Sequence, residues 1–345
     1  MVQLLEEDGP GSATPSGVPG LRGRLSRAGV AARNRRWLLV WAWAVVLAWF
    51  IVARGLPMDR GSQFIWIFGL LFAVNVGRPW RAQGRILLDW LPFVGFLFVY
   101  DYTRGVADTL GRPVHVTEVV AVEEALFGSP VPTVRLQDWL YDPGTVHWYD
   151  FVVSLVYFSH FFVVWIMAVV LYLRSRERWA AWARRLLVLS YAGLVTYILY
   201  PAAPPWFAAR EGVIPWVERL PSRGWDAIGL HGASQLIAYG QAGSNQVAAV
   251  PSLHAAFAAL VMVFLWSSVG WVWRTVLLGY TLAMCFSLVY GGEHYVVDAL
   301  LGYLYVGVIA VVVGLWETWR RRGRQRSGDD DAGAHGDEVE EPLRA

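Results

Sequence analysis

The sequence predicts an all-α membrane protein, a polytopic helix bundle with about eight spans. Hydrophobic residue types make up 56% of the 345 residues and charged types 16%, whereas an ordinary soluble domain is about 45–50% apolar and about 25% charged. Eight apolar stretches divide the chain, and a bilayer-spanning helix needs about 20 such residues. The basic residues, all of them Arg because the sequence contains no Lys, gather in alternate connecting segments.

The apolar stretches occupy residues 37–53, 62–77, 86–101, 151–173, 185–202, 252–269, 271–290 and 294–316. The fourth, seventh and eighth match a spanning helix in length and composition. The second and third are short and contain Asn75, Asp89 and Pro92. Buried helices of a large soluble protein are the alternative, but the Arg-rich or Trp/Pro-rich loops between eight such runs favour membrane spans.

The ends of the chain differ from this membrane-embedded domain, which we assign to residues 37–316. Residues 1–36 are rich in Gly, Pro, Ser and Arg without an apolar period, which predicts a disordered cytoplasmic tail. Residues 317–345 are Arg-rich and then acidic, which is typical of a solvated cytoplasmic tail. Within the domain, the long segment after the third span contains a stretch at 116–127 that predicts an amphipathic interfacial helix.

The distribution of arginine predicts the orientation. If the N-terminal tail is cytoplasmic, 21 arginines lie in segments assigned to the cytoplasm and 8 in outer segments, as the positive-inside rule requires. An even number of spans also places both Arg-rich tails on one side. We therefore predict a multi-pass plasma-membrane protein whose two termini are cytoplasmic.

Charge and cysteine content exclude several classes of protein. The net charge of +2 excludes strong overall attraction to nucleic acid, so we predict no nucleic-acid partner. Cys285 is the single Cys of the sequence, which excludes an internal disulfide framework and a multi-Cys metal site.

One candidate for chemistry is the segment Glu293-His294-Tyr-Val-Val-Asp298. His294 and Asp298 are four residues apart and therefore share one helix face. Asp298 lies about one turn inside an apolar span, where an ionisable group is costly and indicates function. Its carboxylate could accept the imidazole N–H and raise the basicity of the other ring nitrogen, which makes His294 a candidate nucleophile. The alternative is a His at a helix start with a capping carboxylate.

The second candidate is Val250-Pro251-Ser252-Leu253-His254. Pro and Ser before an apolar run are helix-start signals, and they place His254 in the first turn of the sixth span. Free N–H groups there favour a phosphate or another anion, and His254 could protonate an oxygen that leaves it. A purely structural His is the alternative. Because the sixth and eighth spans both begin outside, His254, His294 and Asp298 should meet on the extracytoplasmic side.

These residues also match a known family. Pro251-Ser-Leu-His254 followed by His294-x-x-x-Asp298 resembles the second and third motifs of the type 2 phosphatidic acid phosphatase (PAP2) superfamily. With Tyr200-Pro-Ala-Ala-Pro-Pro-Trp206 upstream, the chain is most similar to the inositol phosphorylceramide synthase (Aur1-like) branch, especially its bacterial members. The resemblance covers about residues 86–316 and implies a six-helix core.

The resemblance implies a mechanism residue by residue. His294 would attack phosphorus and form a phosphohistidine, Asp298 would orient His294, and His254 would protonate the departing alcohol and later deprotonate the acceptor. No cofactor is implied. Two His and one Asp could instead hold a metal, but no further acidic or Cys ligand has a recognisable spacing, so we predict no metal.

The sequence also departs from the phosphatases of this superfamily. Leu71 and Gly105 stand where their first motif has Lys before Arg-Pro, and Leu288 replaces the Arg of their third motif. The Aur1-like and sphingomyelin-synthase-like branches also lack this phosphate clamp, so its loss favours them. The residues that would bind substrate in its place are predicted to be Ser252, Arg104, Arg223 and Trp206. His160, Asn75 and Asp89 are predicted to make interhelical hydrogen bonds, and nothing in the spacing of His231 places it in the site.

The leading hypothesis is a membrane enzyme that transfers a phospho-head group between lipid or polyol hydroxyls at the outer face. Its partners would be the membrane and a phospholipid or other lipid phosphate. A lipid phosphate phosphatase is the alternative if water is the acceptor. A non-enzymatic transporter or scramblase is the alternative of another class, and it predicts broken helices and charges along the spans, whereas the notable charges here lie near one face. A degenerate scaffold is disfavoured because all three core residues are present.

Overall fold

The computed structural model describes residues 21–55, 57, 59–229 and 245–336, and this part of the chain is helical, with isolated β-bridges and no strand. The helices are α1 Leu21–Arg54, α2 Arg60–Asn75, α3 Trp80–Val106, η1 Ala107–Leu110, α4 Thr117–Phe127, α5 Pro132–Leu140, α6 Trp148–Arg174, α7 Arg176–Leu199, α8 Pro205–Arg210, α9 Arg223–Ala227, α11 Leu253–Leu265, η2 Trp266–Ser268, α12 Trp271–Tyr290 and α13 Val296–Gly336. The predicted all-α class is confirmed.

All eight predicted apolar stretches lie in helices. Five helical segments of the described chain are long and apolar enough to cross a bilayer: Asn34–Arg54 of α1, α3, α6, α12 and Val296–Gly323 of α13. The other three stretches form α2, which has 16 residues, the equally short apolar helix Leu253–Ser268, and α7, which begins with several charged residues. The count of eight spans therefore stays a prediction.

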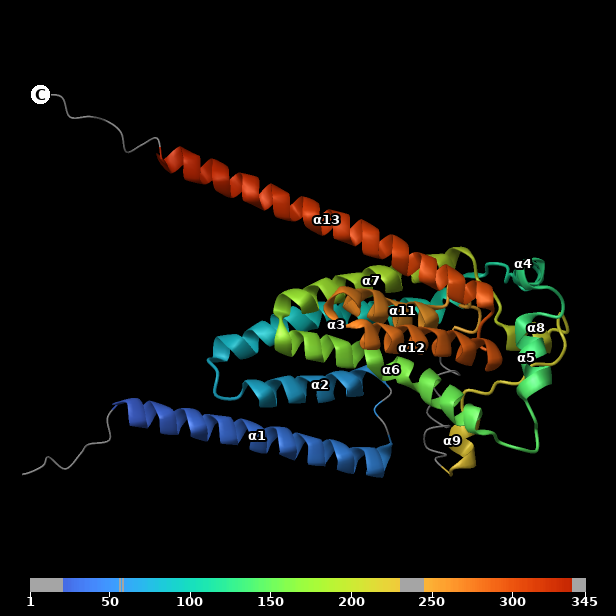
Figure 1. The fold of residues 1–345 in the computed structure, drawn as a ribbon, viewed down its shortest axis with the longest axis horizontal. Coiled ribbons are helices and arrows are strands. Elements are labelled where there is room, and N and C mark those ends of the chain that lie inside the picture. Colours follow the sequence, from blue (N-terminus) through green and yellow to red (C-terminus); the bar gives the residue numbers. More distant parts are fainter. Residues whose placement is uncertain (1–20, 56, 58, 230–244, 337–345) are drawn as a thin grey trace, which may run out of the picture.

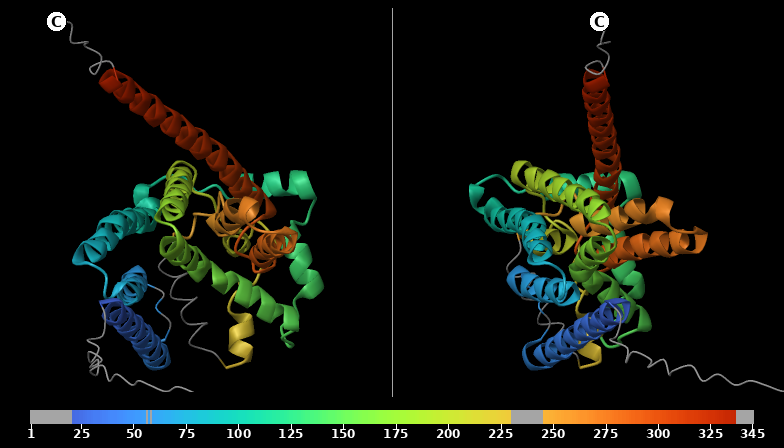
Figure 2. Two further views of the ribbon diagram at one scale, coloured as in Figure 1. Left: turned by 60° about the vertical axis from the view of Figure 1, so that its left-hand side comes forward. Right: turned by 90° about the vertical axis from the view of Figure 1, so that its left-hand side faces the viewer.

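Helices extend into both tails, including part of the N-terminal tail predicted to be disordered. Helix α1 extends back to Leu21, inside the segment 1–36, while residues 1–20 lie outside the described chain. The part that is helical contains Leu, Arg and Ala, which are good helix formers, and has no Pro. Helix α13 likewise continues through the charged segment after residue 317 to Gly336, and in Figures 1 and 2 it projects well beyond the bundle.

The bundle has a core of long helices and an end covered by short ones. Helix α11 packs against α12 and α13, α6 against α7 and α12, and α3 against α7. Helices α1 and α2 lie side by side on one flank, and α4, α5 and α8 gather near the end of the bundle opposite the projecting part of α13 (Figures 1 and 2).

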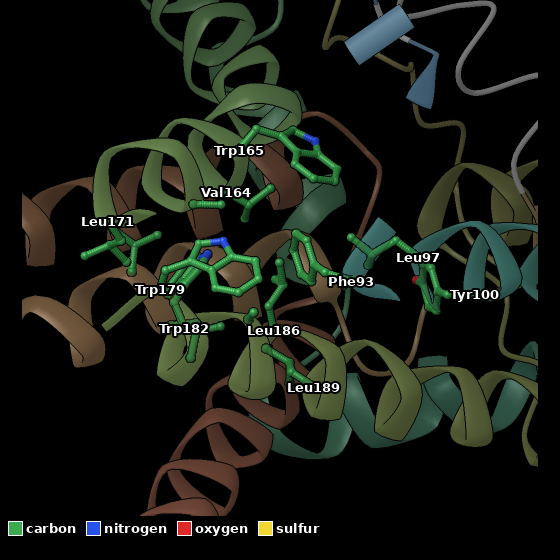
Figure 3. Packing of buried hydrophobic residues seen from close by; sticks show 14 of the residues in the cluster. Phe93, Leu97, Tyr100, Val164, Trp165, Leu171, Trp179, Trp182, Leu186 and Leu189 are labelled. Atoms are coloured by element: carbon green, nitrogen blue, oxygen red, sulfur yellow. The ribbon is translucent and has the colours of Figure 1, made fainter. Parts of the chain in front are cut away.

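The core where α3, α6 and α7 meet is rich in tryptophan (Figure 3). Trp90 and Trp179 stack with ring centroids 5.5 Å apart, and Phe93 meets Trp165 edge to face at 6.0 Å. Buried aromatic side chains contribute large contact areas and directional ring packing. This packing fixes α6 relative to its neighbours, and α6 in turn supplies one wall of the candidate site.

Candidate active site

A cavity of about 190 Å³ opens near the end of the bundle where α6, α11 and the start of α13 converge. It is lined by two predicted catalytic residues, His254 and His294, and by two predicted substrate-binding residues, Arg104 and Trp206. The lining residues come from α2, α3, α6, α7, α8 and α11 and from the segments before α9, α11 and α13, so elements far apart in sequence form one pocket.

His294 and Asp298 contact each other at the start of α13. The His294 Nδ1 atom lies 3.3 Å from Asp298 Oδ2, and the backbone N–H of Tyr295 donates to the same oxygen at 2.9 Å. Asp298 is completely buried and His294 nearly so. Asp298 therefore both caps the helix start and engages the imidazole. With its proton on Nδ1, His294 keeps the Nε2 lone pair for reaction.

His254 lies in the first turn of α11, as the sequence predicts. Ser252 is the N-cap, and its Oγ accepts the N–H of Ala255 at 3.3 Å. The His254 and His294 rings lie 5.5 Å apart between centroids. An anion in this pocket would meet a helix N-terminus and two imidazoles, an arrangement suited to a phosphate ester.

The two histidines meet because α11 and α13 approach very closely. The Ser252 N–H donates to the Asp298 carbonyl at 3.0 Å, which ties the two helix starts together. One turn further along α13, Gly302 lies so close to α11 that a Cβ would stand 2.6 Å from the Ser252 carbonyl oxygen. The glycine at this position therefore permits the contact that brings the two catalytic candidates to one wall.

We expect Gly302→Ala to lower the thermal unfolding midpoint of the detergent-purified protein, because the added methyl would force overpacking that costs about 1–3 kcal/mol. Gly307→Ala is the matched control on the same helix, since nothing lies within 4 Å of a Cβ there and Ala is the better helix former by about 1 kcal/mol. Thermal scans should show Gly302→Ala melting below wild type and Gly307→Ala at or above it. Equal midpoints for the two variants would contradict the close helix contact.

Trp206 is held in the pocket by a short seam of backbone hydrogen bonds. The Ala202 N–H donates to Val247 O at 2.8 Å, and the Ala203 N–H donates to His115 O at 2.9 Å. The Trp206 N–H donates to Gly292 O at 3.2 Å. The proline-rich exit from α7 is therefore fixed against three other segments, and Trp206 lies next to the loop that precedes His294.

Three arginines line the pocket, and they differ in their partners. Arg60 pairs with Asp101, with Nη2 2.9 Å from Oδ1. Arg219 makes a bidentate pair with Glu293, both bonds at 2.9 Å, and its guanidinium lies 4.4 Å from the Trp206 ring centroid. Arg104, by contrast, has a buried Nε without a hydrogen-bond partner among the described residues. It is therefore the pocket cation best placed to receive a phosphate oxygen.

A third histidine enters the pocket from α6. The His160 ring lies 4.0 Å from that of His254, between centroids, and stacks on Phe257 at 5.6 Å. Tyr157, also of α6, stacks on the His254 ring with 5.3 Å between the ring centroids. The predicted interhelical role of His160 overlooked this location. The signal was present, since His160 is an ionisable residue in the middle of an apolar span.

The other polar residues occupy structural positions. Asp89 accepts hydrogen bonds from Arg176 and from Tyr172, which join α3 to the α6–α7 corner. Asn75 donates to Leu71 O within its own helix rather than between helices. His231 lies outside the described residues.

The structure does not bring two predicted substrate-binding residues to the pocket. Ser252 is completely buried, and its hydroxyl caps α11. Arg223 lies on the side of Asp150, 3.4 Å from that carboxylate, and donates to Thr145 O at 2.9 Å. Arg219, four residues earlier in the same segment, lines the pocket instead.

Glu123 of α4 holds the start of α13 from outside that helix. Its fully buried carboxylate accepts the N–H groups of Val296 at 2.9 Å and of Val297 at 3.0 Å. Such first-turn N–H groups have no partner within their own helix. Burial raises the pKa of the Glu123 carboxyl above its usual value. The amphipathic segment predicted at 116–127 therefore has a specific task, to cap the helix that carries Asp298.

We expect Glu123→Ala to lower both thermal stability and kcat, because the loss of a helix cap costs about 1–2 kcal/mol and loosens the His294–Asp298 segment. Glu123→Gln should be milder, since it keeps one carbonyl oxygen and avoids the cost of burying a charge. Glu124→Ala, at the less buried neighbouring position, is the control. Thermal midpoints and kcat measured together test this, and a Glu123→Ala protein as stable and active as the Glu124→Ala control would rule the capping role out.

Within the described residues, no group of three or more His, Cys, Asp and Glu side chains is arranged to hold a metal ion. The pocket instead combines a buried His–Asp pair, a second His, and Arg104, whose buried Nε has no hydrogen-bond partner in the part of the chain that the structure describes. Such a set can perform nucleophilic displacement with general acid–base assistance.

The chain is similar to known proteins of one superfamily. The sequence profile described as "PAP2 superfamily" matches residues 117–312. The chain is 26% identical over 275 residues to a phosphoinositol dihydroceramide synthase of Bacteroides thetaiotaomicron, which covers 75% of this chain and 86% of that protein. It is 24% identical over 285 residues to the inositol phosphorylceramide synthase catalytic subunit aur1 of Schizosaccharomyces pombe, which covers 81% of this chain and 65% of that protein. No solved structure matches the chain significantly.

Proposed function

The chain belongs to the PAP2 superfamily, in its Aur1-like branch, and from this premise we propose that it is a membrane phosphotransferase that moves a phosphorylated head group from one lipid to the hydroxyl of another. The observation that carries the proposal is the meeting of His254 and His294 in one pocket, with Asp298 behind His294. The His294 imidazole, oriented by Asp298, would act as the nucleophile. The His254 imidazole would donate and accept the proton.

The reaction has two half-reactions on the same atoms. In the first, His294 Nε2 attacks phosphorus, the bond from phosphorus to the donor lipid oxygen breaks, and protonated His254 gives its proton to that oxygen. In the second, the acceptor hydroxyl loses its proton to His254 and attacks the phosphohistidine, which releases His294. Asp298 stabilises the positive charge that develops on the His294 ring in each step.

The phosphate would be held by Arg104 and by the first turn of α11. The motif arginine and lysine of the phosphatases are absent, and Arg104 supplies a cation with a buried, unpartnered N–H within the described chain. Its contact with a phosphate oxygen would strengthen as negative charge accumulates at phosphorus.

Two kinds of side chain line the pocket, which supports transfer between lipids. The Trp206 ring with the Arg219–Glu293 pair would suit a hydroxyl-rich head group. Tyr157, which stacks on His254, and Phe257, which stacks on His160, are aromatic. A polyol head group would stay on phosphorus beside the polar groups while lipid alcohols exchange beside the aromatic ones. The names of the relatives favour inositol as the head group and a ceramide-type lipid as the acceptor.

The test is an assay of purified protein with phosphatidylinositol that carries radiolabelled phosphate, with and without dihydroceramide. We expect wild-type protein to transfer labelled phosphoinositol to dihydroceramide, and to release little soluble label when dihydroceramide is left out. The His294→Asn variant should give only background signal. If soluble phosphoinositol were released at equal rates with and without dihydroceramide, the reaction would be hydrolysis and not transfer. Wild-type protein no more active than His294→Asn with any lipid phosphate would refute the enzymatic proposal and leave a transporter or scramblase.

The active site is proposed to face outward from the plasma membrane, with both termini cytoplasmic. The excess of Arg in the opposite loops supports this orientation. In a Cys285→Ala background, an impermeant thiol reagent added to intact cells should label Trp216→Cys, which is exposed beside the pocket segment, and not Trp80→Cys at the opposite end. The reverse labelling pattern would overturn the orientation.

A further inference from the structure

A second cavity lies outside the pocket, between α1, α2 and α6, and we call it the flank groove. Its volume is about 510 Å³, and Gln63 is the one polar residue among those that line it. Residues typical of its walls are Trp43 and Leu47 of α1, Ile67 and Leu70 of α2, and Ile166 and Val169 of α6. The helices that form it lie together along one flank of the bundle in Figures 1 and 2.

The flank groove adjoins the catalytic pocket at one contact. On α6, His160 and Phe161 line the pocket, whereas Phe162 and Trp165, on another face of the helix, line the groove. The Arg60 guanidinium, a pocket residue, lies 5.4 Å from the ring centroid of Trp165, a groove residue. These two side chains therefore mark the place that a lipid must pass to extend from the pocket into the groove.

Helix α2 has residues of both cavities on one face. Arg60 lines the pocket, and Gln63, Ile67 and Leu70 follow it at intervals of three and four residues in the groove. Residues at this spacing share one helix face. One face of α2 thus runs from a charged end at the pocket to an apolar end in the groove, which is the polarity of a lipid from head group to chain.

The length of the groove suits a hydrocarbon chain. From Phe162 to Leu173, the part of α6 that lines the groove, the helix rises about 17 Å. This rise is comparable to one leaflet of a hydrocarbon core that is about 30 Å thick.

We propose that the flank groove holds a hydrocarbon chain of the lipid whose phosphate lies in the catalytic pocket. The inference rests on the proposed function and adds to it the location of the chain. Bilayer lipid is as apolar as the groove, so a chain gains little hydrophobic free energy by moving from the bilayer into the groove. Binding in the groove would instead position the lipid. The groove would set the depth and direction of the lipid so that its phosphate reaches His294.

The first experiment narrows the groove. Val169→Trp and Leu70→Trp place a large ring in it, and Val188→Trp, an exposed position on α7 that lines neither cavity, is the matched control. We expect the two groove variants to lose about tenfold in kcat/KM with dipalmitoyl phosphatidylinositol, from overpacking against the chain, and to match the control with dihexanoyl phosphatidylinositol. Equal losses with both chain lengths, or no loss with either, would overturn the proposal.

The second experiment does not depend on turnover. Phosphatidylinositol with a photoactivatable diazirine in its acyl chain is irradiated with the full-length His294→Asn protein, and labelled peptides are mapped. We expect label on the groove faces of α2 and α6 and its loss in the added Val169→Trp variant. Label spread evenly over the exposed surface of α7 would refute the groove. A wild-type protein without transferase activity would refute the proposed function while this labelling still reports on chain binding.

Discussion

Replacing His294 with asparagine is expected to abolish transfer, with kcat lowered by roughly 10⁴-fold or more, as for other enzymes that lose the nucleophile of a coupled set. Asparagine is close to histidine in size and polarity but offers no basic ring nitrogen to phosphorus. The position tolerates a polar side chain, since His294 lies at the pocket wall and its backbone N–H already donates to Leu288 O. The His294→Asn protein should therefore fold as the wild type does and yet lose its activity.

The measurement is transfer of labelled head group from phosphatidylinositol, together with a thermal scan of the same preparation. Asp298→Asn is the companion variant. It should be less damaging to chemistry than His294→Asn and more damaging to stability, because Asp298 also accepts the Tyr295 N–H inside a fully buried site. A His294→Asn protein with a wild-type melting curve and wild-type turnover would exclude His294 as the nucleophile.

Replacing His254 with alanine is expected to slow transfer by about 10²- to 10⁴-fold, the usual contribution of a positioned general acid–base. The loss should depend on the leaving group. A lipid alkoxide leaves poorly without a proton, whereas a nitrophenyl leaving group needs none. The variant should therefore still be phosphorylated by a nitrophenyl phosphodiester and then stall, since no group remains to deprotonate the acceptor.

Labelled nitrophenyl phosphodiester should consequently leave acid-labile label on the His254→Ala protein, in the peptide that contains His294. Wild-type protein should pass the label to dihydroceramide, and a His254→Ala, His294→Asn double variant should hold none. Label on any other residue would contradict the assigned nucleophile. Loss of activity equal for lipid and nitrophenyl leaving groups, without trapped label, would contradict proton donation by His254.

Some of the site could be predicted from local geometry. The spacing of four residues predicts a shared helix face for His294 and Asp298, and Ser252 marks a helix start that places His254 in its first turn. The structure confirms the position of His254. It shows the His294–Asp298 contact as well, but α13 begins at Val296, so His294 precedes the helix and the contact spans the helix start. Local geometry does not bring the two histidines together. That prediction also needed the topology, in which the helices that carry them both begin on the same side of the membrane.

The loop residues could not be predicted in this way. Arg219 and Arg223 lie in one outer segment, and the sequence offers no reason to prefer either. The chain direction turns Arg219 toward Trp206 and Glu293, while Arg223 meets Asp150. Which of these two loop arginines lines the pocket therefore depends on the path of the loop, which is set by contacts with other segments.

The location of His160 in the pocket could not be predicted from the sequence either. A lone histidine in an apolar span faces a neighbour helix, a cavity or a structural partner, and periodicity alone does not distinguish these. Its contact with the His254 ring follows from the way α6 packs against α11. The capping of α13 by Glu123 has the same origin, since the two elements are separated by more than 170 residues.

The sequence by itself determined the all-α membrane class, the family, and the spacing of His294 from Asp298, because composition and short-range spacing are local properties of the chain. The tertiary structure decided which outer-loop arginine enters the pocket, the place of His160, the capping of α13 by Glu123 and the flank groove beside α6. Each of these depends on how separate helices approach one another. That approach is set by close contacts such as Gly302 against Ser252, which no local pattern encodes.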